Sequence, residues 1–381
     1  DMMNVLSESN PKGTVTRYTY DGRYRLLTKS VGNYQETYTY QDGLSNGDKI
    51  IKTVVGNSSQ APDIKTAMYV DKYGRLGYES AFNGTQELKT SYTYDISGNL
   101  LTVLNAKDAA DRRSYSTKYT YGNISTGPVI TAEDALGNET EERYDYLGRK
   151  ISEKDAMGNI TTYTYDGRGY LSQATIPFEG SYYQTKKYTY DGNGNKIGVK
   201  VSVNKPGEQM REVETTYLYN SMNRLTKATS AGNVVDYGYD PMGNKTSVKT
   251  AGGSQITAYE YDHFSRMTKM TDPMGLSERY EYDRNGNMVK KVDRNGTVIN
   301  YTYDINNRLT ETRAAVGTAQ QAEYMKTTYG SNGLVMSTEN ENYRTDNIYD
   351  GLGRLIVQTG SDGTRKDYGY DVLGNRTSFT L

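Results

Sequence analysis

The chain of 381 residues contains no cysteine, no tryptophan and a single histidine. Without cysteine there is no disulfide scaffold, no thiol nucleophile and no zinc-cysteine site. One histidine excludes a histidine-rich metal site. Lysine and arginine number 45 against 46 aspartates and glutamates, so the charge is balanced and no basic surface for nucleic acid is indicated.

Long apolar runs are also missing. No run approaches 18 residues, so we expect no membrane span. There is no signal peptide and the chain opens at Asp1, which we interpret as an excised piece or a mature form of something longer. The absence of cysteine is compatible with export.

Aliphatic residues are scarce, since Leu, Ile, Val and Phe together number 62. Tyrosine (39 residues) and threonine (45 residues) take their place, and both prefer the pleated, half-buried surface of a strand. The net charge is only −1, so the shortage of aliphatics does not predict disorder.

A repeat runs from end to end, with the unit Tyr-x-Tyr-Asp-x-x-Gly-Asn/Arg-Leu. We place its second tyrosine in sixteen copies at intervals of 20 to 29 residues: 20, 40, 69, 94, 121, 144, 165, 190, 219, 239, 261, 282, 303, 329, 349 and 370. No linker interrupts the copies, which predicts a single array over residues 1–381 with no separate catalytic domain.

Each part of the unit has a structural role. Tyr-x-Tyr places both rings on one face of a strand. Asp begins a turn, and its carboxylate can accept a hydrogen bond from the backbone two residues on. Gly three residues later suits the left-handed position of a hairpin loop with a bulge. The structural residues that we single out are Tyr20, Asp21, Tyr94, Asp95, Gly98, Tyr165, Asp166, Tyr190, Asp191, Gly194, Tyr239, Asp240, Gly243, Tyr282, Asp283, Gly286, Tyr370, Asp371 and Gly374.

A second turn often follows about ten residues later, as at Asp134, Asp155, Asp272 and Asp293. Each repeat is therefore expected to be one antiparallel hairpin, and no helical stripe persists. Sixteen hairpins at about 4.8 Å between strands give a sheet on the order of 150 Å wide, and open sheets of that width curl. The predicted fold is all-β, a continuous antiparallel meander wound into a spiral or a hollow β-shell segment.

The repeat resembles the YD repeat of Rhs proteins, which the C component of insecticidal Tc toxins, wall-associated contact-dependent toxins and the teneurins share. The resemblance covers nearly the whole chain. It implies a hollow β-shell that, in the toxins, encloses a C-terminal toxic domain. It therefore implies two partners, the remainder of the chain's own shell and an enclosed or attached effector domain.

The sequence also departs from that family. The family's shell-closing core has two closely spaced Asp-Pro-x-Gly motifs and an aspartate autoprotease. Here Asp240-Pro-Met-Gly and Asp272-Pro-Met-Gly are separated by 28 residues, and more repeats follow. We interpret both as repeat turns with Pro at the favoured position. We expect the closing core and the cargo to lie outside this chain.

Candidate catalytic and metal sites are weak. Evenly spaced aspartates lack the paired environments that acid–base chemistry needs. The segments that begin at Asp191 and Asp283 resemble the start of an EF-hand loop, but Gly is misplaced and the twelfth residues are Ser202 and Arg294. His263 lies in a turn and is expected to be solvated. We predict no catalytic residue, metal or cofactor.

Insertions between repeats are the remaining candidates for binding. They fall at 43–63, 106–116, 177–184, 204–211 and 314–323, and we expect all of them at the end of the hairpins opposite the Tyr-Asp turns, because extra residues inside a strand would reverse every following side chain. Variable loops on a rigid scaffold commonly carry specific contacts. The predicted partner contacts are Phe178, Tyr182 and Tyr183.

The preferred function is structural: a wall segment of a secreted or surface-displayed bacterial shell that encapsulates or presents another polypeptide. The alternative is an extracellular adhesin that binds protein or, through its planar rings, carbohydrate. An enzyme is disfavoured.

Overall fold

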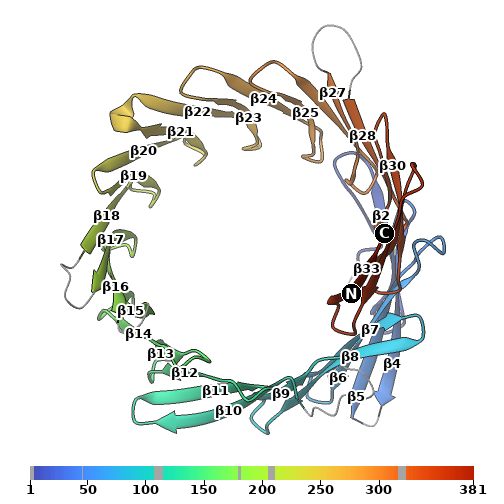
Figure 1. Ribbon diagram of the computed structural model, residues 1–381, viewed down its shortest axis with the longest axis horizontal. Helices are drawn as coiled ribbons and strands as arrows, with labels where there is room; N and C mark the ends of the chain where they lie inside the picture. The colour runs from blue at the N-terminus through green and yellow to red at the C-terminus, as the bar shows by residue number, and fades with distance from the viewer. Residues whose placement is uncertain (1–3, 45, 107–114, 179–181, 205–210, 316–322) are drawn as a thin grey trace. The chain divides into compact units, whose positions relative to one another are not determined.

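The computed structural model describes residues 4–44, 46–106, 115–178, 182–204, 211–315 and 323–381. In these residues the chain is all-β, with 33 strands and one 3-10 turn, η1 (Ala251–Gly253). No helix in this part of the chain is long and apolar enough to cross a membrane. The strands follow one another as an antiparallel meander (Figure 1), which confirms the predicted fold class.

Contacts divide the chain into two compact units, and both contain repeats. Unit 1 comprises residues 1–116 and 279–381, and unit 2 comprises residues 117–278. Within each unit every strand pairs antiparallel with the strand that follows it. The expectation of one array over residues 1–381 stays a prediction.

Unit 1 holds the first nine strands and the last ones. They are β1 (Ser7–Ser9), β2 (Val15–Tyr20), β3 (Leu26–Val31), β4 (Tyr34–Leu44), β5 (Gly47–Val54), β6 (Ile64–Asp71), β7 (Leu76–Asn83), β8 (Gln86–Tyr94), β9 (Leu100–Leu104), most of β24 (Ser277–Tyr282), β25 (Met288–Val292), β26 (Val298–Tyr303), β27 (Leu309–Ala315), β28 (Glu323–Tyr329), β29 (Val335–Glu339), β30 (Arg344–Tyr349), β31 (Leu355–Gly360), β32 (Arg365–Tyr370) and β33 (Arg376–Thr380).

Unit 2 holds the strands between them. They are β10 (Thr117–Ile124), β11 (Gly127–Asp134), β12 (Glu139–Tyr144), β13 (Lys150–Lys154), β14 (Ile160–Tyr165), β15 (Leu171–Phe178), β16 (Tyr182–Tyr190), β17 (Lys196–Asn204), β18 (Arg211–Tyr219), β19 (Leu225–Ser230), β20 (Asn233–Tyr239), β21 (Lys245–Thr250), β22 (Gln255–Tyr261) and β23 (Met267–Thr271).

A bulge marks the end of most repeat strands. In β16 and β17, Thr189 pairs with Gly198 but Tyr190 pairs with Lys196, so β17 has one extra residue. Thirteen of the sixteen predicted second tyrosines end their strand at such a register shift. Most repeat hairpins therefore end in the same way, with a bulge followed by a turn.

Three copies of the repeat differ from the prediction. In the third copy the shift falls between Tyr69 and Val70, and Asp71 begins the turn, so Val70 and not Tyr69 holds the second-tyrosine position. Beyond Tyr40 and Tyr121, β4 and β10 run on for several residues. Neither tyrosine is followed by Asp, so no Asp turn stops the strand there.

The two ends of the hairpins form two rims. We name the end where an even-numbered strand turns into the next odd-numbered strand the Tyr-Asp rim, and the other end the opposite rim. The opposite rim also has regular turns, because Gly137, Gly158 and Gly275 close Asp-x-x-Gly turns there. Both rims therefore use the same turn.

The insertion prediction is partly wrong. The range 43–63 was expected to be one insertion, but it contains the whole of β5. The residues of this range that lie outside β5 are at both rims: some are at the β4–β5 hairpin end on the Tyr-Asp rim, and residues 55–63 form a loop on the opposite rim. Of the remaining ranges, residues 107–114, 179–181, 205–210 and 316–322 lie outside the described residues. The strand ends that border them, such as Phe178 with Tyr182, are at the opposite rim.

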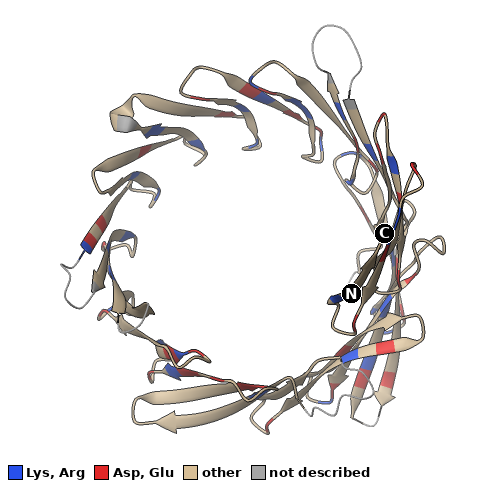
Figure 2. Ribbon diagram, viewed as in Figure 1, with Lys and Arg blue, Asp and Glu red and all other residues tan. Residues whose placement is uncertain are grey.

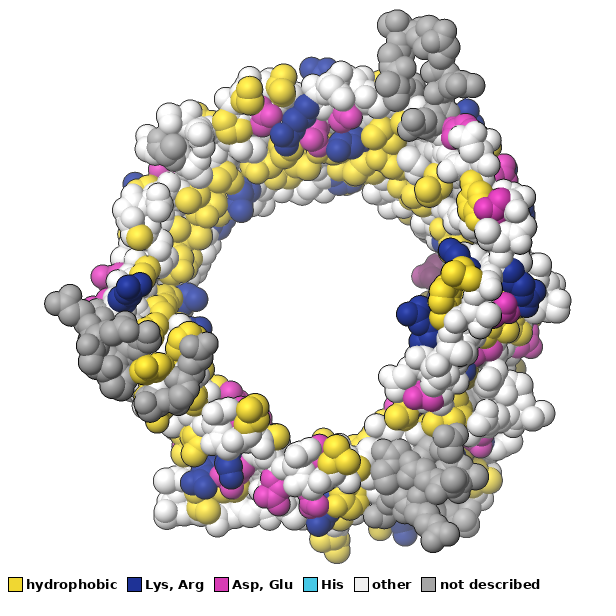
Figure 3. Space-filling model, viewed as in Figure 1, with side chains coloured by type: hydrophobic (Ala, Val, Ile, Leu, Met, Phe, Trp, Pro, Cys, Tyr) yellow, Lys and Arg dark blue, Asp and Glu magenta, His cyan; other side chains and the backbone are white. Residues whose placement is uncertain are grey.

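Neither unit has a deep apolar core. No large side chain among the described residues is fully buried, and the buried apolar residues are Ala61, Ala67, Ala174 and Val357. In unit 2 apolar side chains gather on the concave side of the sheet (Figure 3). Acidic and basic residues are both scattered over the strands (Figure 2). Stability must therefore come from the hydrogen-bonded ladder and from side chains that link successive hairpins.

Candidate functional site

The tyrosines define one face of the sheet. In Tyr188-Thr189-Tyr190 both tyrosines are half-buried and Thr189 is exposed, and the same alternation recurs in other repeats. Cross-strand partners share a face, so Val199, which pairs with Tyr188, lies on the tyrosine side. We call this side the tyrosine face.

The second tyrosine of a repeat ties its hairpin to the preceding one. The Tyr190 hydroxyl donates to the main-chain carbonyl of Leu171 at 3.0 Å, and the Tyr239 hydroxyl donates to that of Leu225 at 2.8 Å. The acceptor lies next to the bulge of the preceding hairpin, since Leu171 pairs with Tyr165 and Leu225 pairs with Tyr219. Because a bulge disrupts the ladder, the tyrosine satisfies a carbonyl that would otherwise need water.

The first tyrosine often donates to a glutamate on the same face. The Tyr163 hydroxyl lies 2.6 Å from Glu153 Oε1. Burial, together with this hydrogen bond to a carboxylate, raises the pKa of Tyr163 to about 12. The neutral phenol is therefore the stable form at physiological pH.

The turn aspartate organises its own loop. Asp191 Oδ1 accepts from the backbone N–H groups of Asn193 and Asn195, each at 2.9 Å, and Oδ2 accepts from Asn195 Nδ2 at 2.8 Å. The side-chain bond from Asn195 and these backbone bonds lower the pKa of Asp191. The glycine prediction is confirmed, since φ is positive at the five named positions: Gly98 90°, Gly194 87°, Gly243 98°, Gly286 90° and Gly374 89°.

Arginine at the fourth position after Asp has a role that sequence reasoning missed. Arg354 Nη1 donates to the carbonyl of Asp371 in the next repeat at 3.0 Å, and its guanidinium lies 4.8 Å from the centroid of the Tyr370 ring. Its Nε also holds Asp350 of its own turn at 2.8 Å. In the sequence, the alternation between Asn and Arg at this position was the signal that could have indicated this role.

The residues considered as catalytic or metal-binding candidates in the sequence lie in the turns of the repeats. Asp283 Oδ1 accepts from the backbone of its own loop, as Asp191 does. Gly243 and Gly275 donate to the carbonyls of Asp240 and Asp272, as in other repeat turns. The His263 ring packs 4.0 Å from the Phe264 ring. Among the described residues, no group of three or more His, Asp or Glu side chains could hold a metal ion.

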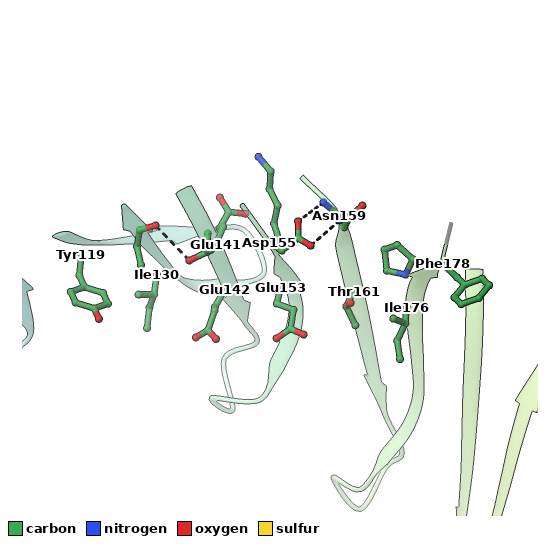
Figure 4. A pocket seen from close by; sticks show the side chains of 14 residues that line it. Tyr119, Ile130, Glu141, Glu142, Glu153, Asp155, Asn159, Thr161, Ile176 and Phe178 are labelled. Carbon is green, nitrogen blue, oxygen red and sulfur yellow. Dashed lines mark hydrogen bonds between the residues drawn. The ribbon is translucent and has the colours of Figure 1, made fainter. Parts of the chain in front are cut away.

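A groove of about 750 Å³ crosses the sheet in unit 2 (Figure 4). Its lining includes Ile130, Glu142, Glu153, Thr161 and Ile176. Register places Ile130 opposite Glu142 and Glu142 opposite Glu153, so these side chains share one face, which also carries Tyr163. The groove therefore lies on the tyrosine face.

The carboxylates of the groove are partly compensated. Lys150 Nζ donates to Glu142 and, at 3.2 Å, to Glu153. The hydrogen bond from Lys150, with a second from Tyr144, lowers the pKa of Glu142. The groove thus combines carboxylates with the apolar side chains of Ile130 and Ile176, so its lining is both charged and apolar.

The three predicted partner contacts are divided between two faces. Phe178 pairs with Tyr182 and Pro177 with Tyr183. Phe178 lines the groove, and Tyr182 shares its face. Tyr183, half-exposed at 49%, lies on the reverse side. The three residues therefore cannot form a single binding surface.

Comparison with known proteins agrees with the repeat chemistry. The family model described as RHS Repeat matches residues 144–178, 219–255, 261–298, 282–319 and 349–380. The chain therefore contains RHS repeats in these segments. This YD-repeat chain is 26% identical over 214 residues to the tRNA3(Ser)-specific nuclease WapA of Bacillus spizizenii, in an alignment that covers 52% of the chain and 8% of WapA.

Solved structures extend the fold match to most of the YD-repeat chain. The crystal structure of TcdB2-TccC3-TEV is similar with a TM-score of 0.76 and 16% identity, over 97% of this chain and 22% of that one. The Tc holotoxin pore of Photorhabdus luminescens gives a TM-score of 0.73 and 16% identity, over 97% and 21%. The chain thus spans about a fifth of these toxin chains and less than a tenth of WapA.

Proposed function

We propose that this repeat scaffold is a wall segment of a secreted or surface-displayed shell whose tyrosine face encloses or presents another polypeptide. The observation that carries the proposal is the asymmetry of the sheet. One face concentrates rings, apolar side chains and the groove, whereas the other carries exposed threonines such as Thr189. A single-layer sheet of this kind leaves its apolar face available to a partner.

The fold match supports the same proposal. It relates nearly the whole chain to a part of Tc toxin structures. At 16% identity, this match shows a shared fold and nothing more. We propose no catalytic role. The described turn aspartates accept hydrogen bonds within their own loops, and they recur with the repeat, as a structural device would.

Cysteine accessibility tests the proposal, because the native chain has no cysteine. Ile176→Cys reports on the groove, and Thr189→Cys is the matched control on the reverse face. In the isolated chain a bulky maleimide should modify both. In the polypeptide at its natural length, Ile176→Cys should be protected while Thr189→Cys stays reactive. Equal reactivity of the two in the long protein would contradict enclosure and favour an open adhesin.

A further inference from the structure

A row of side chains crosses the tyrosine face of unit 2 close to its Tyr-Asp turns. Each member pairs directly with the second tyrosine of a repeat, so Leu171 lies opposite Tyr165 and Lys196 lies opposite Tyr190. Neighbours in the row are two strand spacings apart, which is about 10 Å. On the odd-numbered strands from β15 to β23 the members are Leu171, Lys196, Leu225, Lys245 and Met267, which we call the Leu-Lys row.

The two lysines of the row have fixed positions and exposed side chains. The Tyr219 hydroxyl donates to the Lys196 carbonyl at 3.0 Å, and the Tyr261 hydroxyl donates to the Lys245 carbonyl at 2.9 Å. The Lys245 ammonium lies 5.0 Å from the centroid of the Tyr237 ring. A ring attracts a cation without neutralising it. Both ammonium groups therefore keep their charge at defined places on the tyrosine face.

The carboxylates of the same strands lie on the other side of the sheet. In the described parts of β14 to β22 they belong to Glu212, Glu214, Asp236 and Glu260, and the strand register places all four on the reverse face. Two of them form ion pairs with reverse-face lysines, Lys200 with Glu212 at 2.6 Å and Lys227 with Asp236 at 3.3 Å. The reverse face thus balances its own charge.

The tyrosine face of these strands has basic residues instead. Those in the described part of β14 to β22 are Lys186, Lys196, Arg211 and Lys245. The nearby turn aspartates, such as Asp191 and Asp240, accept hydrogen bonds within their own loops. Within the described residues neither Lys196 nor Lys245 forms an ion pair. The face therefore offers an unbalanced positive charge between apolar side chains, and basic side chains are visible among the apolar ones in Figure 3.

We propose that the polypeptide held on the tyrosine face of unit 2 places an acidic segment along the Leu-Lys row. The inference rests on the proposed function and names the chemistry of its partner. Charge complementarity favours carboxylates at Lys196 and Lys245, and Leu225 between them favours an apolar side chain.

The spacing of the row defines the segment further. Lys196 and Lys245 lie on β17 and β21, four strand spacings or about 19 Å apart, which an extended chain covers in about six residues. The fitting segment has Asp or Glu at both ends of this span and an apolar residue about three positions from each.

Carbodiimide coupling tests the proposal in the polypeptide at its natural length, because the reagent joins an ammonium to a carboxylate in contact with it. Mass spectrometry of the digest should find Lys196 and Lys245 joined to Asp or Glu from outside residues 1–381. Lys200 is the matched control on the reverse face and should be joined to Glu212. Coupling of Lys200 without such coupling of Lys196 or Lys245 would overturn the acidic partner.

The maleimide reactivity of Ile176→Cys separates this inference from the proposed function. Protection of that cysteine without coupling of Lys196 and Lys245 would mean that a polypeptide is held but has no carboxylates at the row, which overturns this inference alone. A reactive cysteine together with missing couplings would overturn both.

Charge exchange in the isolated chain tests the same contact by titration calorimetry. The wild-type chain should bind the peptide Glu-Ser-Ser-Leu-Ser-Ser-Glu about tenfold more tightly than Lys-Ser-Ser-Leu-Ser-Ser-Lys. Lys196→Glu/Lys245→Glu should reverse this preference. Lys187→Glu/Lys249→Glu makes the same charge change at exposed positions of the reverse face and should keep it. Equal or undetectable binding of the two peptides by the wild-type chain, or a reversal in the control, would overturn the proposal. Far-ultraviolet circular dichroism checks that both variants remain folded.

Discussion

The tyrosine that bridges successive hairpins gives the sharpest prediction of stability. Tyr190→Phe removes the hydroxyl that donates to the Leu171 carbonyl at 3.0 Å and leaves the ring, which stacks 4.9 Å from Tyr170, in place. The acceptor lies at a bulge, and one such hydrogen bond contributes about 1 kcal/mol. Loss of about 1 kcal/mol corresponds to about a fivefold rise in the population of locally open states.

Hydrogen exchange measured by mass spectrometry resolves this effect. Amides of β15 to β17 should exchange about fivefold faster in Tyr190→Phe, whereas β30 to β33 should be unchanged, because contacts in a repeat array are made with neighbours. Tyr183→Phe is the control, since this half-exposed tyrosine lies on the reverse face. Unchanged exchange in Tyr190→Phe, or the same acceleration in Tyr183→Phe, would refute the reasoning.

Three further predictions concern the turns and the chemistry. Gly286→Val and Gly374→Val should lower the free energy of unfolding by about 1–2 kcal/mol or more because φ is 90° and 89°, with the larger effect at the more central Gly286. Gly286→Asn should be tolerated, since Asn307 adopts φ 60° at the same turn position. Equal thermal melts for the Val and Asn variants would contradict this. Turn aspartates such as Asp191 have a lowered pKa in the folded chain, so their stabilisation is present above about pH 4 and is lost as pH falls further. The pKa values of Tyr92 and Tyr163 are raised to about 12, so these tyrosines stabilise the fold up to about pH 10 and cease to do so as pH rises toward 12. Thermal melts across about pH 2 to 12 check both effects. The purified chain should show no hydrolase, nuclease or protease turnover, and a robust activity abolished by one Asp→Asn change would argue against a purely structural role.

Local features of the fold were predictable because they depend on short-range rules. Alternation of side chains predicted the tyrosine face, and the Asp-x-x-Gly spacing predicted turns with positive φ at Gly98 and Gly194. The turn requires a positive φ rather than glycine itself, since Asn223 and Ser265 have φ values of 57° and 61° at the same turn position.

Features that depend on register or on distant contacts were not predictable. The third repeat is an exception, because Asp71-Lys-Tyr-Gly marks its turn in the sequence and the choice of Tyr69 as its second tyrosine overlooked that motif. The alignment of Glu142 with Glu153 in the groove requires the pairing of two strands. The rim contact of Ser331 with Val55 joins residues 276 positions apart, and no local periodicity encodes it.

Site-specific photo-crosslinking tests most directly the claim that the tyrosine face holds a polypeptide. A benzoylphenylalanine at Ile176 in the groove, or at Thr189 on the reverse face, would be introduced into the polypeptide at its natural length and irradiated. The account predicts that Ile176 crosslinks to peptides from outside residues 1–381 and that Thr189 does not. Crosslinks of that kind from Thr189 alone, or none from Ile176, would contradict it.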